Sequence, residues 1–440
     1  FLLELVTLSV ATNVCSDNPR PGLNSAKLFT NAQALIDGLV ASGKYAGVAA
    51  MVSRHGDEWV GVAGMADLES EKKMTPDTIF RVCSMTKPIV SVAVLTLLEQ
   101  GKLQLNDPVS KYLPEFAQDR MKVMELCEEN QDCPEVGFKL VDSVTPITIQ
   151  HLLIHQAGIS YTFLDHYGMG EQHSHFARLG QEAGLTDGCG GATVDLAEHA
   201  RLIASMPLLT QPGTSFTYGL GTDVLGRVVE VISGETLGDY LQRHIFEPLQ
   251  MTDTFFHIFP ETNAEDQAKK DRMATMYYKN PGEGLKSARA DEVDHEYYAR
   301  SETTAYAGAR SLESGGCGLA STAGDYTKFL QMLATGGEPV LGRKTVELLR
   351  QDYLPPSVNA FFPDSGFGLG FSFARKPGTH ASVGTLGWAG WHQTQFIVDL
   401  DEGLSVVLLT QCHGWSYGCF MAVSPDFAAL LAIAGGAILC

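Results

Sequence analysis

Segments typical of β-strands lie near both ends of this 440-residue chain, and segments typical of helices fill the middle. Two early runs, 46–52 and 59–62, are apolar and separated by turn residues around Gly56, which predicts a hairpin. Three late runs are short, β-branched or aromatic, and bounded by turns: 368–373, 395–398 and 404–409. The simplest fold with this order is a mixed α/β (α+β) fold. Its antiparallel sheet is built from both chain ends and flanked by helices, with a mostly helical domain inserted.

This order also predicts the domain organisation. We expect an N-terminal extension at 1–27, a discontinuous sheet domain at 28–115 and 311–440, and an inserted helical domain at 116–310. Helical segments are predicted at 28–39, 87–100, 149–155, 193–206, 222–233, 236–245 and 321–333. Polar surface excursions are predicted at 117–144 and 261–305.

The two chain ends are apolar but too short to span a bilayer. Residues 1–11 are interrupted by Glu4 and are consistent with a trimmed signal peptide. The tail at 427–440 is predicted to form a helix packed on the sheet. No integral membrane segment is therefore expected.

Composition narrows the classes of function. Hydrophobic residues make up 45% of the chain and charged residues 19%, which is typical of a globular protein. The net charge of −20 gives no basic footprint for nucleic acid, so no nucleic-acid partner is expected. The phosphate-loop motif, paired Cys-x-x-Cys motifs and the His-Glu-x-x-His metal motif do not occur in the sequence.

A serine and a lysine stand three residues apart in an apolar setting. Ser84 precedes Lys87, and residues 89–100 after them are apolar and helix-forming. Residues three apart share a helix face, so the hydroxyl and the amine can meet. Burial lowers the pKa of a lysine, and an uncharged amine can act as the base for a serine nucleophile. The alternative is a helix-capping serine followed by a lysine that extends to solvent.

Two other serines have motif-like surroundings. Ser70 also precedes a lysine, Lys73, by three residues, but the flanking charges predict a solvated turn. Ser416 lies in a Gly-x-Ser-x-Gly run, the pattern of α/β-hydrolases. In that fold the histidine follows the serine, whereas the last histidine here is His413, so we interpret the run as a glycine-rich turn.

Two further segments could complete a site around Ser84. Tyr218 lies on a turn before a predicted helix, and a phenol near a lysine can ionise more easily and exchange protons with the serine. Segment 386–391 contains Trp388, Gly390 and Trp391 beside small residues that allow close approach to its backbone. This strand edge could give one backbone N–H to an oxyanion, with the N–H of Ser84 as the second donor. Each segment alone also fits an ordinary structural role.

The nine cysteines and His155 are interpreted mainly as structural residues. Cys127 with Cys133, and Cys412 with Cys419, could each form a disulfide, although an odd count does not require one. Cys83 is interpreted as a small packing residue. His155 stands at a helix end, where a histidine commonly caps carbonyl groups, and is interpreted as structural.

The ordered pieces Ser84-x-x-Lys87, Tyr218 and Trp388-Ala389-Gly390 resemble the serine β-lactamase and penicillin-binding-protein superfamily. The closest likeness is to class C β-lactamases and family VIII carboxylesterases. Further segments that look like the family are 106–116, 149–158, 247–254 and 316–325, so the resemblance covers about residues 28 to 411.

The resemblance implies roles for these residues and no metal or cofactor. Ser84 would be the acylated nucleophile, Lys87 its base partner and Tyr218 the proton shuttle, with the Trp391 N–H as an oxyanion donor. Trp391 and His392 could line the substrate pocket, opposite a wall of Tyr161, Phe163 and His166.

Two positions depart from the β-lactamase pattern. Leu220 stands where β-lactamases often carry an asparagine, and Trp388 stands where they carry a lysine that meets the carboxylate of the drug. Losing such a charge-assisted contact removes about 1.5–3 kcal/mol. A tryptophan at this position is similar to what family VIII esterases show, so both departures favour neutral esters.

We therefore predict a serine hydrolase, a carboxylesterase that cleaves small carboxylic esters through an acyl-enzyme on Ser84. The alternatives are a β-lactamase or D-amino-acid amidase or peptidase, an acyltransferase, and an inactive scaffold protein of the same fold. The expected partner is a small-molecule ester. The sequence leaves open the oligomeric state and the compartment, cytoplasmic or secreted (periplasmic).

Overall fold

The main structural feature is an eight-stranded antiparallel sheet. The computed structural model describes residues 25–127, 137–167, 169–188, 194–279, 284–288, 312–355, 358, 364–376, 381–414 and 424–436. Across the sheet the strands are β10 (Ser365–Phe367), β11 (Ser372–Ala374), β12 (Leu386–Gly390), β13 (Thr394–Asp399), β14 (Leu404–Thr410), β1 (Gly47–Arg54), β2 (Asp57–Asp67) and β3 (Lys72–Lys73).

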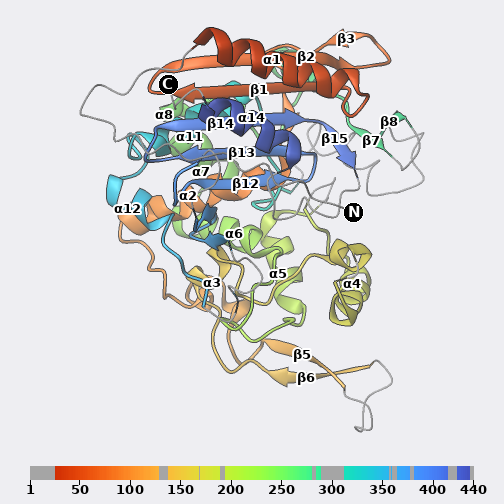
Figure 1. The fold of residues 1–440 in the computed structure, drawn as a ribbon. Coiled ribbons are helices and arrows are strands. Elements are labelled where there is room, and N and C mark those ends of the chain that lie inside the picture. Colours follow the sequence, from red (N-terminus) through yellow and green to blue (C-terminus); the bar gives the residue numbers. More distant parts are fainter. Residues whose placement is uncertain are drawn as a thin grey trace, which may run out of the picture.

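The two chain ends meet in the middle of this sheet. Strand β1 pairs with β14 from Val48 opposite Thr410 to Arg54 opposite Leu404, and β1 forms the predicted hairpin with β2. The sheet built from both chain ends is therefore confirmed. In Figure 1 the sheet lies in the upper part of the molecule, and most of the helices from the middle of the chain lie below it.

Both faces of the sheet are buried, which explains why its central strands read as continuous apolar runs. Side chains alternate along β1, so that Val48, Ala50 and Val52 face one core whereas Ala49 and Met51 face the other. Helices α1 (Ser25–Ala41) and α14 (Pro425–Gly436) cover the first face. Helix α11 (Ala323–Ala334) packs on the other face. The predicted C-terminal helix on the sheet is confirmed.

The larger core lies between the sheet and the helices of the middle of the chain. Helix α2 (Thr86–Glu99) runs through it with every residue from Thr86 to Leu97 buried, and contacts α6 and α7. The remaining helices are α3 (Ile149–Leu153), α4 (Glu171–Ala183), α5 (Leu196–Ser205), α6 (Gly221–Ser233), α7 (Leu237–Leu241), α8 (Glu247–Leu249), α9 (Ala264–Arg272) and α12 (Arg343–Leu348). A π-helical turn, Gln242–Phe246, joins α7 to α8.

Small sheets complete the fold. Strand β4 (Phe80–Arg81) pairs with β9 (Ala320–Ser321), and β5 (Lys122–Leu126) pairs with β6 (Phe138–Asp142). A third sheet contains β15 (Cys412–Gly414), β7 (Tyr277–Lys279) and β8 (Leu285–Ser287). Short 3₁₀ turns occur at η1 (Cys83–Met85), η2 (Val109–Lys111), η3 (Pro114–Phe116) and η4 (Thr162–Tyr167).

Several local predictions differ from the structure, including the excursion predicted at 261–305, which contains α9, β7 and β8. The predicted excursion at 117–144 contains the β5–β6 ribbon, whose strands mix charged and apolar residues because much of the ribbon is exposed. The strand predicted at 368–373 is interrupted by a tight turn at Gly370, where φ is +87°, so β10 ends before it and β11 begins after it. Helix α4 was not predicted, because it is polar on most sides and buries only Phe176 and Gly180.

Other predictions made from the sequence agree with the structure only in part. Cys412 is a free, buried thiol, so the Cys412–Cys419 disulfide is wrong, whereas Cys127 is disulfide-bonded. Cys317 is also disulfide-bonded, which the sequence did not predict. The stretch proposed as a signal remnant lies outside the described residues, and the domain boundaries stay predictions. Within the described part of the chain, no helix combines the length and apolar character needed to cross a bilayer.

Replacing Phe396 with alanine should destabilise the fold strongly. Its ring lies between the sheet and α11, with ring centroids 5.2 Å from Tyr326 and 6.2 Å from Phe371. Removing a buried phenylalanine side chain costs about 3–5 kcal/mol, so Tm measured by circular dichroism should fall by several degrees. Val60→Ala, on the exposed side of β2, is the control. Equal melting temperatures for the two variants would contradict this packing.

Candidate active site

Ser84 lies in a strained turn immediately before the buried helix α2. It is the middle residue of η1, and Cys83 at the start of that turn has φ +46°, in the left-handed region. Tyr326 anchors the turn by donating a hydrogen bond from its hydroxyl to the carbonyl of Met85 at 2.8 Å. Such strain at a non-glycine residue persists only where the surrounding structure fixes it, and it is common at functional sites.

Lys87, one turn later, is buried and surrounded by oxygen atoms. Its Nζ lies 3.2 Å from Ser84 Oγ, 2.8 Å from the Tyr161 hydroxyl and 2.7 Å from the carbonyl oxygen of Gly316. No carboxylate among the described residues forms an ion pair with it. An ammonium can donate to all three oxygens, whereas a neutral amine would donate to two and accept from one hydroxyl. The site can therefore hold the amine in either form.

Tyr218 approaches Ser84 from the other side. Its hydroxyl donates a hydrogen bond to Ser84 Oγ at 2.8 Å, and the Lys87 Nζ lies 4.7 Å from the centroid of its ring. The next residue, Gly219, passes so close to Ile159 that an added Cβ would lie 2.2 Å from the Ile159 carbonyl oxygen. Only glycine fits there, which fixes the chain direction just after the tyrosine.

The structure thus brings together the three side chains singled out from the sequence. Ser84 Oγ has two neighbours, the Lys87 amine and the Tyr218 hydroxyl, that could accept its proton on nucleophilic attack. This is the geometry of an activated serine: a nucleophile, a base within hydrogen-bond reach, and further groups that orient the base. The individual catalytic roles stay predictions.

Strand β12 runs directly beside the Ser84 turn. A Cβ on Gly390 would lie 2.3 Å from the carbonyl oxygen of Val82 and 2.3 Å from Thr394 Oγ1, so only glycine allows this approach. Thr394 also donates a hydrogen bond to the Val82 carbonyl at 3.2 Å. The amide of Trp391 follows at the end of this strand, next to the turn that carries Ser84. The proposed oxyanion role of the two amides stays a prediction.

Aromatic rings surround the site. Trp388 is buried, with its ring 5.7 Å from Tyr218 and 5.3 Å from Phe367. Trp391 contacts Phe163 edge to face at 4.6 Å, so these two predicted wall residues meet each other. The site is therefore bordered by apolar surface.

The other predicted wall residues are His392, Tyr161 and His166. His392 is buried, with Nδ1 3.1 Å from Cys83 Sγ, and its expected place in the pocket wall stays a prediction. Tyr161 is buried and contacts Lys87 through its hydroxyl. The side chain of His166 lies outside the described residues.

Cys83 is not a rival nucleophile. Its thiol is free and buried, and burial raises its pKa to about 12, which keeps it protonated near neutral pH. Arg81, Lys87 and hydrogen bonds from the backbone of His392 and Trp391 act in the opposite direction but do not offset the burial.

His155 packs beneath Tyr218 and does not cap a helix through its ring. Its ring centroid lies 4.8 Å from that of Tyr218 and 5.6 Å from those of Phe216 and Phe367. Burial, with a smaller contribution from the charge of Lys87, holds its pKa well below 6.5, so the ring is neutral. The structural interpretation stands, but the capping contact expected from its position was wrong.

One of the two motif-like serines, Ser70, lies away from this geometry. Ser70 is exposed in the turn between β2 and β3, as predicted. The neighbouring Lys72 is half-buried, and burial lowers its pKa, so it is less solvated than expected. Ser416 lies outside the described residues.

Sequence reasoning missed the groups behind Lys87. The Tyr161 hydroxyl and the Gly316 carbonyl lie 74 and 229 residues after Lys87 in the sequence. Neither residue belongs to a motif with a characteristic spacing from Lys87. Next to Gly316 lies Asp223, fully buried, which accepts a hydrogen bond from Ser314 at 2.6 Å. The family-like segment 316–325 was the one available signal for this region.

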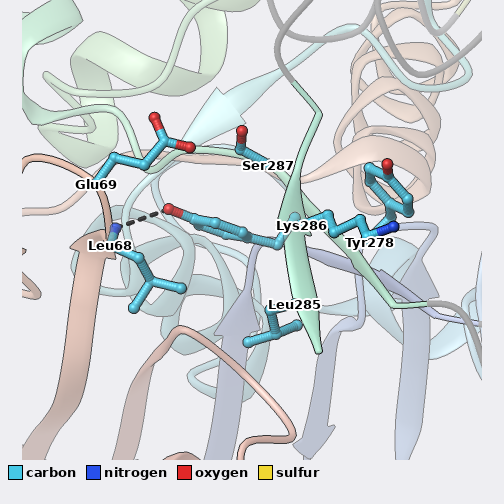
Figure 2. A pocket seen from close by; sticks show the side chains of 7 residues that line it. Leu68, Glu69, Tyr278, Leu285, Lys286 and Ser287 are labelled. Atoms are coloured by element: carbon cyan, nitrogen blue, oxygen red, sulfur yellow. Dashed lines mark hydrogen bonds between the residues drawn. The ribbon is translucent and has the colours of Figure 1, made fainter. Parts of the chain in front are cut away.

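A separate pocket lies beside the small third sheet (Figure 2). The Leu68 N–H donates a hydrogen bond to the Tyr277 hydroxyl at 2.7 Å across it. The other lining residues are Glu69, Tyr278, Leu285, Lys286 and Ser287. None of the candidate catalytic residues lines it. Within the described ranges, no cluster of histidine, cysteine, aspartate and glutamate is arranged to hold a metal ion.

Comparison with known proteins defines the class. The Beta-lactamase family model matches residues 32–423, so the chain belongs to the Beta-lactamase family. Esterase EstB of Burkholderia gladioli is 32% identical over 397 residues, which cover 88% of this chain and 91% of EstB. Protein Rv1367c of Mycobacterium tuberculosis is 30% identical over 390 residues, covering 83% of this chain and 86% of that protein.

Solved structures agree with this assignment. The structure of EstCE1, described as a hydrolase with promiscuous acyltransferase activity, is 27% identical with a TM-score of 0.73, covering 94% of this chain and 99% of EstCE1. Unliganded simvastatin synthase from Aspergillus terreus has a TM-score of 0.70 at 22% identity, covering 94% of this chain and 98% of that one, which shows the shared fold.

Replacing His155 with phenylalanine should reduce the acid sensitivity of the fold. The folded-state pKa of His155 is lowered, so below about pH 6.5 the unfolded chain binds the extra proton and the free energy of unfolding falls. For one group this slope reaches about 1.4 kcal/mol per pH unit. Tm measured from about pH 8 to pH 5 should therefore fall more steeply for wild type than for His155→Phe. Parallel curves would argue against this assignment.

Proposed function

We propose that this chain is a serine carboxylesterase that hydrolyses small carboxylic esters through an acyl-enzyme on Ser84. The observation that carries the proposal is that Ser84 Oγ lies 2.8 Å from the Tyr218 hydroxyl and 3.2 Å from the buried Lys87 amine. Family membership, and the likeness to an esterase across 88% of the chain, support the same chemistry.

Acylation begins when Ser84 Oγ attacks the ester carbonyl carbon. As the new C–O bond forms, the serine proton passes to the Lys87 amine, which must be uncharged to accept it, and the carbonyl oxygen becomes an oxyanion. The N–H groups of Ser84 and Trp391 would stabilise that oxyanion. Collapse of the tetrahedral intermediate breaks the bond to the alcohol oxygen, which leaves with a proton from Tyr218.

Deacylation repeats the sequence with water. The Tyr218 oxygen, which gave its proton to the alcohol, accepts a proton from water as the water oxygen attacks the acyl carbon. Ser84 Oγ then recovers its proton from Lys87 as it leaves. The product is the carboxylic acid, and the enzyme returns to its starting state.

The strand opposite Ser84 favours esters over β-lactams. Trp388, in the position of the β-lactamase lysine, is buried against Tyr218 and Phe367 and provides no cation for a drug carboxylate. Leu220, where an asparagine is common, is fully buried and provides no amide. A β-lactamase or D-amino-acid amidase is thus disfavoured, and the intact Ser84–Tyr218 geometry argues against an inactive scaffold.

Acyl transfer to an alcohol is the second candidate. It needs only that an alcohol replace water in deacylation, with the same bonds formed and broken. EstCE1, which resembles this chain at a TM-score of 0.73, is described as having promiscuous acyltransferase activity. We therefore include this activity in the tests below.

Ser84→Ala should abolish hydrolysis of p-nitrophenyl butyrate, with kcat reduced by at least about 10⁴-fold, because the acyl-enzyme cannot form. A fluorophosphonate probe should label wild type at Ser84, identified by peptide mass spectrometry. Ser70→Ala, which alters the other Ser-x-x-Lys run, is the matched control and should keep full activity. Hydrolysis retained by Ser84→Ala at the wild-type rate would refute the mechanism.

Esters should be turned over far better than β-lactams. Because charge-assisted and amide contacts are missing, kcat/KM for a short p-nitrophenyl ester should exceed that for nitrocefin by about two decades or more. The panel should include esters of increasing acyl length, nitrocefin, a D-alanine amide, and an ester with added alcohol acceptors. Comparable rates for nitrocefin and the best ester would instead identify a β-lactamase, and predominant ester exchange would identify an acyltransferase.

A further inference from the structure

The two amides of the proposed oxyanion hole come from chain segments about 300 residues apart, so something must set their spacing. One donor, the N–H of Ser84, lies in the η1 turn, and the other, the N–H of Trp391, follows β12. The backbones approach closely at Gly390, and Thr394 donates a hydrogen bond to the Val82 carbonyl. These contacts join Val82, two residues before the first donor, to Gly390 and Thr394 on either side of the second.

A second link joins the residues immediately beside the donors. Cys83 directly precedes Ser84, and His392 directly follows Trp391. The Cys83 Sγ lies 3.1 Å from His392 Nδ1, and both side chains are buried, with exposed fractions of 2% and 5%. The backbone of Trp391 also interacts with this sulfur. The thiol therefore contacts the segment that holds the second donor.

Neither the Cys83 thiol nor the His392 imidazole is charged. Burial holds the pKa of His392 well below 6.5, with a contribution from His413, and burial keeps the Cys83 thiol protonated. The charge of Arg81 acts on both groups, and Lys87 also lies near the thiol. The contact is thus a hydrogen bond between a neutral thiol and a neutral imidazole.

We propose that the Cys83–His392 contact is a positioning device that sets the spacing of the Ser84 and Trp391 amides and so tunes oxyanion stabilisation. The proposal rests on the proposed function, because it assigns these amides to the oxyanion. It also accounts for the left-handed backbone of Cys83, since a positive φ at a non-glycine residue persists only where neighbouring contacts fix it.

The structural alternative is that Cys83 is a small packing residue and nothing more. The two interpretations differ in what a substitution changes. Lost packing lowers stability, whereas a displaced oxyanion donor weakens transition-state binding and leaves ground-state binding nearly unchanged. Kinetics on the full-length enzyme can therefore separate them.

Cys83→Ala and His392→Leu should each lower kcat for p-nitrophenyl butyrate by about tenfold with KM within about twofold, since small displacements of catalytic groups cost rate. Cys83→Ser keeps a hydrogen-bonding group and should recover most of that loss. Cys412→Ala removes a second free, buried thiol of the described residues, which lies in the core between the sheet and helices α1 and α14, and should leave kcat unchanged. Binding of phenylboronic acid, whose Ser84 adduct places an oxygen among the oxyanion donors, should weaken in parallel with kcat.

The double variant Cys83→Ala/His392→Leu completes a double-mutant cycle, which measures whether the two side chains act together. If the two side chains act through one contact, the double variant should lose about tenfold, no more than either single variant. An unchanged kcat in Cys83→Ala with only a lower Tm, or losses that multiply to about 100-fold, would overturn the proposal. If Cys83→Ala does not fold, His392→Leu and Cys83→Ser decide it by the same criteria. Failure of wild type to react with the fluorophosphonate at Ser84 would instead count against the proposed function.

Discussion

The site depends on one buried amine whose hydrogen-bond partners come from three separate parts of the chain. Lys87 Nζ contacts Ser84 in the preceding turn, the Tyr161 hydroxyl and the Gly316 carbonyl. A buried lysine is costly unless its donors are paired, so these contacts fix where its side chain must lie. Because Ser84 is one of the three partners, placing the amine also places the nucleophile.

The sheet and helix α2 create the dry surroundings that this amine needs. Strands from both chain ends bury one face under α1 and α14, and the other face joins the core that encloses α2. Since α2 is buried from Thr86 to Leu97, the lysine in its first turn lies at the border between the core and the site. The fold therefore supplies the low-polarity environment, and the turn before α2 exposes the serine.

The residues proposed to select the substrate lie on a different element from those proposed to react with it. Ser84, Lys87 and Tyr218 come from the η1 turn, α2 and the loop before α6, whereas Trp388 lies in β12 and Trp391 directly follows it. A tryptophan in place of a cationic residue on that strand changes which carbonyl compounds fit without altering the nucleophile. The same division leaves Cys83 and His392 able to adjust the distance between the reactive turn and the strand.

The sequence by itself determined the fold class, the pairing of the two chain ends and the candidates Ser84, Lys87 and Tyr218, because periodicity and short spacings encode local structure. Only the tertiary structure decided that Tyr161 and Gly316 hold the lysine, and that the His155 ring packs under Tyr218 rather than capping a helix. It also decided that the His392 ring contacts the Cys83 thiol. These contacts join segments far apart in the chain, and local patterns carry no information about which distant atoms a folded core will bring together.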